Sequence, residues 1–166
     1  MVSLEDIPFN ERWKIASKSA SIMPLLYDSH FRKVLGNKYD EIERPIWIEA
    51  GKEMKDLAMS MGLPSGNARQ IGETLGIISS ISFGPESRYE PPVETKNGAI
   101  EKVTGCAVLN SARQLGLDPK IVALSACRTM IRSAVESLNP DYTILPGTMN
   151  MCSGDKYCEL AIERRR

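Results

Sequence analysis

The chain has 166 residues, of which 42% are hydrophobic and 25% are charged, as is typical of one globular domain with a buried core. Its 21 lysines and arginines equal its 21 aspartates and glutamates, so no charge excess indicates a nucleic acid or a membrane surface as partner. The sequence contains neither an apolar run long enough to span a bilayer nor a signal-peptide pattern, so we expect a cytoplasmic protein with reduced cysteines.

Residues 1–82 have the periodicity of helices. A first helix is expected from Asn10, and Pro24 should kink or end it. A short second piece should then reach Leu35. The apolar stripe of the first helix consists of Trp13, Ala16, Ala20 and Met23.

Two further helices are expected before residue 83. The first begins with Pro45 in its opening turn and ends at Gly62, where a left-handed cap is favoured. The second spans residues 67–80, and Gly72 and Gly76 would let another element approach it closely. The apolar face of the helix after Pro45 comprises Trp47, Ala50, Met54, Leu57, Ala58 and Met61.

Residues 83–166 mix strands with helices. The Asn97-Gly98 pair between two alternating segments predicts a β-hairpin. The inward face of its second strand stays open between two registers, one with Ile100 and Lys102 and the other with Glu101 and Val103.

Two helices should follow the hairpin. One covers residues 108–115 just after Cys106, and the other runs from Asp118-Pro119 to residue 138. Cys127 lies on the apolar face of the longer helix, so we expect it to face the core. Arg128 lies on a flank of that helix, on the same row as Arg132 and Glu136.

A second hairpin is expected over residues 142–163, with its turn at residues 153–156. Cys152 and Cys158 flank this turn, and paired across it their Cβ atoms would lie roughly 5 Å apart. In a reducing compartment we interpret the pair as a structural clasp. The two hairpins and the helices predict a single α+β domain over residues 1–166, with a helical layer on an antiparallel sheet of about four strands.

The common motifs for phosphate binding, dinucleotide binding, zinc proteolysis and serine hydrolysis are absent from the sequence. His30 is the only histidine, and we expect a structural or surface role for it. The four cysteines are separated by 20, 24 and 5 residues, and only the last gap resembles a metal-ligand pair. No cofactor is therefore predicted. Zinc or iron would require Cys106, Cys127, Cys152 and Cys158 together.

Cys106 is the strongest candidate for thiol chemistry. It lies between a strand and a helix, where backbone N–H groups and the helix dipole lower a thiol pKa. Without a second histidine, its base would be a carboxylate, another thiol or water. The alternative for Cys106, and more so for Cys127, is a small buried hydrophobe.

The second half of the chain carries an ordered pattern that resembles the L-2-amino-thiazoline-4-carboxylic acid hydrolase-like family. Its closing hairpin is also similar to that of 4-vinyl reductase-type ligand-binding domains. Where the family usually has proline after its first cysteine, this chain has Ala107. The pattern consists of Cys106 at a strand end, Leu115-Gly116-Leu117, Cys127 within a helix, Asn139-Pro140, and Cys152-x-Gly154-Asp155-x-x-Cys158-Glu159.

The resemblance implies a hydrolase that acts on non-peptide C–N or C–S bonds of a small carboxylate-bearing substrate. The implied catalytic residues are Cys106, Cys127 and Asp155, although Asp155 is also a common turn residue. Arg128 and Asn139 are the candidate substrate-binding residues, because a guanidinium suits a planar anion.

The alternative hypothesis is a module on the same fold that senses a ligand, a metal or a redox change without turnover. Under either hypothesis the partner is a small molecule, and neither nucleic acid nor membrane is expected. Trp47 and the eight methionines would also be compatible with a homodimer.

Overall fold

The fold, taken from a computed structural model that describes residues 3–165 without the side chains of Val122 and Pro146, is α+β. Four strands form an antiparallel sheet in the order β1-β2-β4-β3, built from two hairpins as predicted. The helices are α1 (Phe9–Leu35), α2 (Lys38–Ser60), α3 (Ala68–Phe83), α4 (Ala107–Gln114), α5 (Pro119–Val122) and α6 (Leu124–Leu138). The strands are β1 (Arg88–Thr95), β2 (Gly98–Gly105), β3 (Tyr142–Pro146) and β4 (Cys158–Arg164), and short 3-10 helices occur at η1 (Leu4–Asp6) and η2 (Met151–Ser153).

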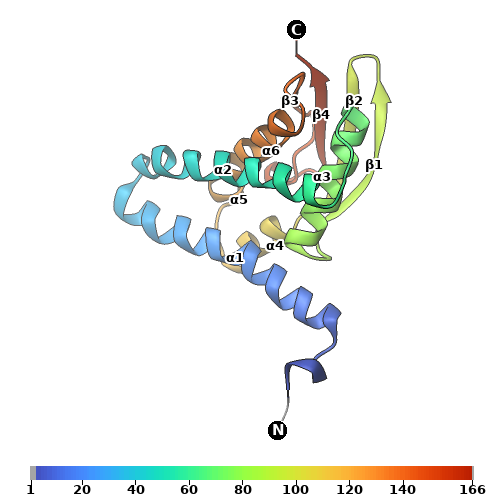
Figure 1. Ribbon diagram of the computed structural model, residues 1–166. Coiled ribbons are helices and arrows are strands. Elements are labelled where there is room, and N and C mark those ends of the chain that lie inside the picture. The colour runs from blue at the N-terminus through green and yellow to red at the C-terminus, as the bar shows by residue number, and fades with distance from the viewer. Residues whose placement is uncertain (1–2, 166) are drawn as a thin grey trace.

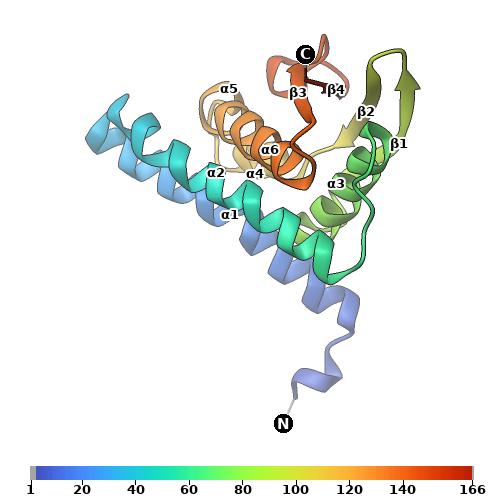
Figure 2. The same ribbon diagram turned by 45° about the horizontal axis from the view of Figure 1, so that its top comes forward.

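Helices α3 and α6 cover one face of the sheet (Figure 1). Figure 2 shows α6 between α2 and β3, while α1 runs alongside α2 and passes α4. The main core lies between these helices and the inner face of the sheet. It includes Ile71, Leu75 and Ile78 of α3, Ile131, Ala134 and Val135 of α6, and Ile144 and Ile162 of the sheet. Among the described residues, no helix combines the length and apolar character needed to cross a membrane.

Of the two outcomes predicted for Pro24, a kink or an end of the first helix, the end is wrong, because α1 continues through Pro24 to Leu35. A proline inside a helix removes the hydrogen bond to the carbonyl four residues earlier, here that of Ala20. Ala20 is exposed, so this carbonyl can be hydrated. The buried stripe of α1 also differs from the predicted one and consists of Ser17, Ser21, Leu25 and Asp28.

The tip of the α1–α2 hairpin contains a charged network. Helix α2 begins earlier than predicted, at Lys38 and not at Pro45, so it includes the network residues Asp40 and Glu43. Arg32 donates to both carboxylate oxygens of Asp28, with Nη2 2.7 Å from Oδ2, and Asp28 is 1% exposed. The same guanidinium bonds Asp40 at 2.7 Å and lies 3.5 Å from a carboxylate oxygen of Glu43. This network joins the two helices at their connection.

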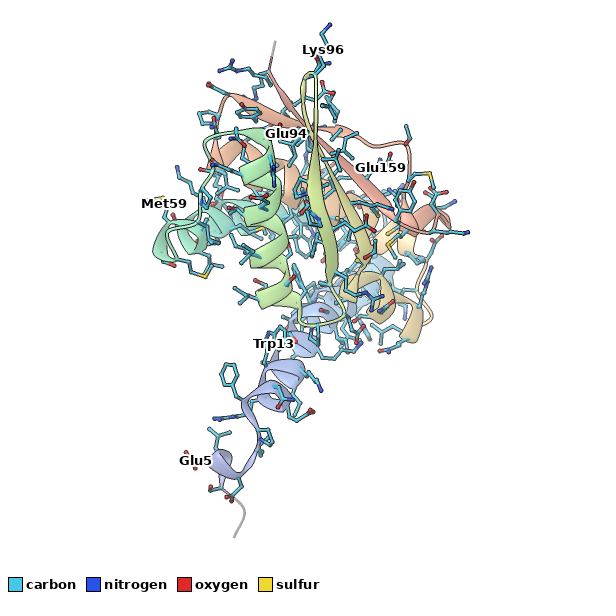
Figure 3. All side chains as sticks on the ribbon, turned by 90° about the vertical axis from the view of Figure 1, so that its right-hand side faces the viewer. Glu5, Trp13, Met59, Glu94, Lys96 and Glu159 are labelled. Atoms are coloured by element: carbon cyan, nitrogen blue, oxygen red, sulfur yellow. The ribbon has the colours of Figure 1, made fainter. Side chains whose placement is uncertain are left out.

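The β1–β2 hairpin is confirmed, and its register settles which face of β2 points inward. Figure 3 shows Lys96 at the tip of this hairpin. Ala99, Glu101 and Val103 are buried, whereas Ile100 and Lys102 are partly exposed. A carboxylic acid therefore occupies the apolar side of a central strand.

The two glycines of α3 allow the close approach that the sequence predicted. A Cβ atom on Gly72 would lie 2.7 Å from Pro92, which is on edge strand β1. A Cβ on Gly76 would lie 3.0 Å from Oε1 of Glu101 and 3.3 Å from the ring of Tyr89. Gly76 thus makes room for the only acidic residue on the inner side of β2.

The second hairpin is confirmed, but Cys152 and Cys158 are not partners across its two strands. Cys158 begins β4 and lies opposite Val103 of β2, while Cys152 is in the 3-10 helix η2. The reason is that β3 ends at Pro146, which leaves a long loop before β4. All four cysteines are free thiols, so no disulfide closes this loop.

Candidate functional site

A cavity of about 380 Å³ runs through the middle of the protein. Its walls come from α1, α2, α3, the inner face of the sheet, α6 and the loop between β3 and β4. Most lining residues are apolar, for example Leu25, Trp47, Met54, Leu75 and Ile131. This volume lies within the range of small-molecule sites in proteins, which are also mostly apolar.

The cavity brings together five of the residues singled out from the sequence. Cys106, Cys127, Arg128, Cys152 and Cys158 all line it. They come from the residue before α4, from α6, from η2 within the β3–β4 loop, and from the start of β4. The fold therefore gathers all four thiols around one space, although long stretches of sequence separate three of them.

Asp155 and Asn139 are not among the residues that line the cavity. Asp155 accepts a hydrogen bond from the backbone N–H of Asn150 at 2.7 Å, which closes the β3–β4 loop. The side chain of Asn139 donates to the carbonyl of Ser65 at 2.9 Å and accepts from the N–H of Asp141 at 3.1 Å. Both side chains thus hold backbone in place.

Cys106 is the N-cap of α4, and its Sγ accepts the N–H of Leu109 at 3.4 Å. Burial nevertheless raises the pKa of this thiol, although the N–H groups of Leu109 and Val108 act in the opposite direction. Desolvation therefore outweighs the helix-terminus effect that the sequence indicated. Cys106 is neutral at physiological pH.

The other three thiols also remain protonated. Burial raises the pKa of Cys127, and the three neighbouring thiols add to the effect. The surface of Cys127 is accessible because it faces the cavity, although protein surrounds it. Burial likewise raises the pKa of Cys152 to about 12 and the pKa of Cys158 above its ordinary value. In the described part of the chain, no three His, Cys, Asp or Glu side chains are close enough to hold a metal ion.

Glu101 is a cavity residue that sequence reasoning missed. It is 1% exposed, and its Oε2 finds no hydrogen-bond partner within residues 3–165. Burial raises the pKa of this carboxyl to about 8, so it is neutral at pH 7. Glu101 shares one face of β2 with Ala99 and Val103, and Ile100 and Lys102 lie on the opposite face, so alternation alone did not show that the acid points inward.

Tyr89 lies beside Glu101 against Gly76 and also lines the cavity. Burial raises the pKa of its hydroxyl, and a hydrogen bond with Ser79 partly offsets this shift. The charged lining residues Glu53, Arg128 and Arg132 are exposed. Glu159, labelled in Figure 3, is partly exposed on β4. The interior of the cavity is therefore neutral, and its ionised groups reach solvent.

His30 takes no part in this site. It is an exposed residue of α1, and its Nδ1 is hydrogen-bonded to the carbonyl oxygen of Leu26 at 2.9 Å. Since it is the only histidine of the chain, no imidazole is available to activate a cavity thiol. The predicted structural or surface role of His30 is confirmed.

No family model matches the chain, and comparison with curated proteins and with solved structures gives no significant match. The resemblance drawn from the cysteine pattern therefore stays an expectation.

Proposed function

We propose that the protein binds a small, mainly apolar molecule in the central cavity and does not turn it over. The observation that carries this proposal is a mostly apolar cavity of about 380 Å³. Burial raises the pKa values of its interior titratable groups, which are Glu101, Tyr89 and the four thiols. Such a lining suits an uncharged ligand, because apolar contacts provide the affinity and a few polar groups orient the molecule.

The states of the thiols support binding over nucleophilic catalysis. A cysteine nucleophile acts as its thiolate, so it needs a lowered pKa or an adjacent base. The four cavity thiols instead have raised pKa values. A carboxyl with a pKa near 8 is also a poor proton acceptor at neutral pH.

The uncharged dye N-phenyl-1-naphthylamine tests the proposal. We expect one dye molecule to bind per chain with a rise in fluorescence, because the cavity replaces water around the dye. Cys127→Phe should abolish this binding by filling the cavity. The matched variant Ser125→Phe should leave it intact, because Ser125 is exposed on the same helix and does not line the cavity. Equal binding to wild type and Cys127→Phe would contradict the proposal.

A second candidate is the hydrolase that the resemblance implies. One observation favours it, namely that the Cys106 sulfur receives the N–H of Leu109 at the start of α4. Under the binding proposal, all four thiols should react with iodoacetamide at neutral pH no faster than free cysteine. Peptide mapping after short labelling would measure this. One thiol that reacts at least about tenfold faster, and is lost in Cys106→Ala, would favour the hydrolase.

A further inference from the structure

Glu101 is the best-placed polar group for orienting a ligand. It belongs to β2 and lies on the inner face of the sheet, where it lines the cavity. Its Oε2 has no hydrogen-bond partner within the described chain. A buried polar atom without a hydrogen bond carries a desolvation penalty. A bound molecule that supplies the missing partner would remove this penalty.

The surroundings of Glu101 are arranged to keep it in this position. Gly76 of α3 leaves the space that Oε1 occupies, since a Cβ there would lie only 3.0 Å from that oxygen. Ala99 and Val103 flank Glu101 on the same face of β2 and offer no polar atoms from their side chains. The carboxyl is thus seated between helix and strand, in the wall of the cavity.

We propose that the Glu101 carboxyl, in its neutral form, donates a hydrogen bond to an acceptor oxygen of a small, uncharged and mainly apolar ligand. This inference rests on the proposed function, because it names the class of molecule that the same cavity takes. A carbonyl or ether oxygen on an aromatic or aliphatic body fits the description. A cationic ligand would instead require Glu101 to be ionised inside an apolar cavity, which is costly.

The pH dependence of ligand affinity can test this hydrogen bond, because an ionised Glu101 has no proton to donate. Besides Glu101, the titratable residues that line the cavity are Glu53, Tyr89, Cys106, Cys127, Arg128, Arg132, Cys152, Cys158 and Glu159. Helix α3 presents Gly76 and Ser79, which do not titrate. The pKa values of Tyr89, Cys106 and Cys127 are all raised by burial. Between about pH 6 and pH 9, Glu101 is therefore the group whose charge changes most.

The test uses two probes of nearly equal shape, acetophenone and α-methylstyrene, which differ by a carbonyl oxygen in place of a methylene group. Dissociation constants would be measured by calorimetry or by ligand-observed NMR at about pH 6 and pH 9. In Glu101→Leu at the lower pH, we expect acetophenone to bind about tenfold more weakly than to wild type. The α-methylstyrene affinity should not fall.

Glu101→Gln separates hydrogen bonding from charge and size. Its amide also donates a hydrogen bond, so acetophenone should bind within about threefold of the wild-type affinity at the lower pH. At the higher pH, wild type should lose acetophenone affinity because a carboxylate cannot donate, while Glu101→Gln should not change.

Several results would contradict a hydrogen bond from Glu101 to the ligand. One is an equal effect of Glu101→Leu on both probes. Another is tighter binding of benzylammonium than of acetophenone to wild type at the lower pH, which would indicate an ionised Glu101. If the naphthylamine dye binds in the cavity but acetophenone does not, the proposed role of Glu101 is wrong and the proposed function stands. If neither binds, both fail.

Discussion

Replacing Glu101 with glutamine will remove a large pH dependence of stability. The pKa of this carboxyl is raised from its ordinary value of 4.5 to about 8 in the folded protein. Between these pH values the folded protein holds a proton that the unfolded chain has lost, so stability falls as the pH rises through this window. Between pH 5 and pH 8 the free energy of unfolding of the variant should gain about 3–4 kcal/mol relative to wild type.

Urea denaturation at several pH values would measure this difference. The comparison uses the change with pH and not the absolute stability, because the glutamine amide has its own cost of burial. Glu94→Gln on neighbouring strand β1 is a suitable control, since Glu94 is exposed. If the free energy of unfolding varies with pH in parallel for wild type and Glu101→Gln, the Glu101 carboxyl ionises normally in the folded protein.

Removing the guanidinium of Arg32 is expected to be the most damaging single change at the α1–α2 hairpin. Arg32→Ala would leave the carboxylates of Asp28 and Glu43 buried, with 1% and 7% of their side chains exposed, and without their cation. Loss of one partner from a buried ion pair typically costs about 3–5 kcal/mol. Burial already raises the pKa of Glu43, in agreement with a desolvated site.

The adjacent variant Lys33→Ala is the matched control, because Lys33 is exposed on the same helix. It should change stability by no more than about 0.5 kcal/mol. Adding Asp28→Asn to Arg32→Ala should recover part of the loss, because one uncompensated charge disappears. A loss in Arg32→Ala no larger than that of the control would show that the network contributes little.

The sequence predicted the fold class well because its strongest signals are local. The Asn97-Gly98 pair marked the first hairpin, and Gly62 and Gly116 lie in the left-handed backbone region where helix ends were expected. Pro24 favoured an end of α1 in the prediction, because a proline removes a backbone hydrogen bond inside a helix. Contacts of both helix halves with the rest of the protein favour continuation.

The site was predicted in part. The cysteine pattern identified four residues that line the cavity, but spacing alone could not show that their surroundings are apolar enough to keep them protonated. The sequence did not identify Glu101, because either face of β2 could point inward given its alternation of apolar and polar residues. The space for the acid comes from Gly76, which belongs to a different element.

A neutral Glu101 carboxyl in the wall of an apolar cavity should titrate well above an ordinary glutamate. The most direct measurement is a pH titration of the ¹³C carboxyl signals of protein labelled at glutamate Cδ, with Glu101→Gln to assign the signal, before and after addition of acetophenone. We predict a midpoint near pH 8 for Glu101 in the free protein and a higher midpoint with the ligand bound. A midpoint near the ordinary glutamate value, or one that the ligand leaves unchanged, would contradict this account.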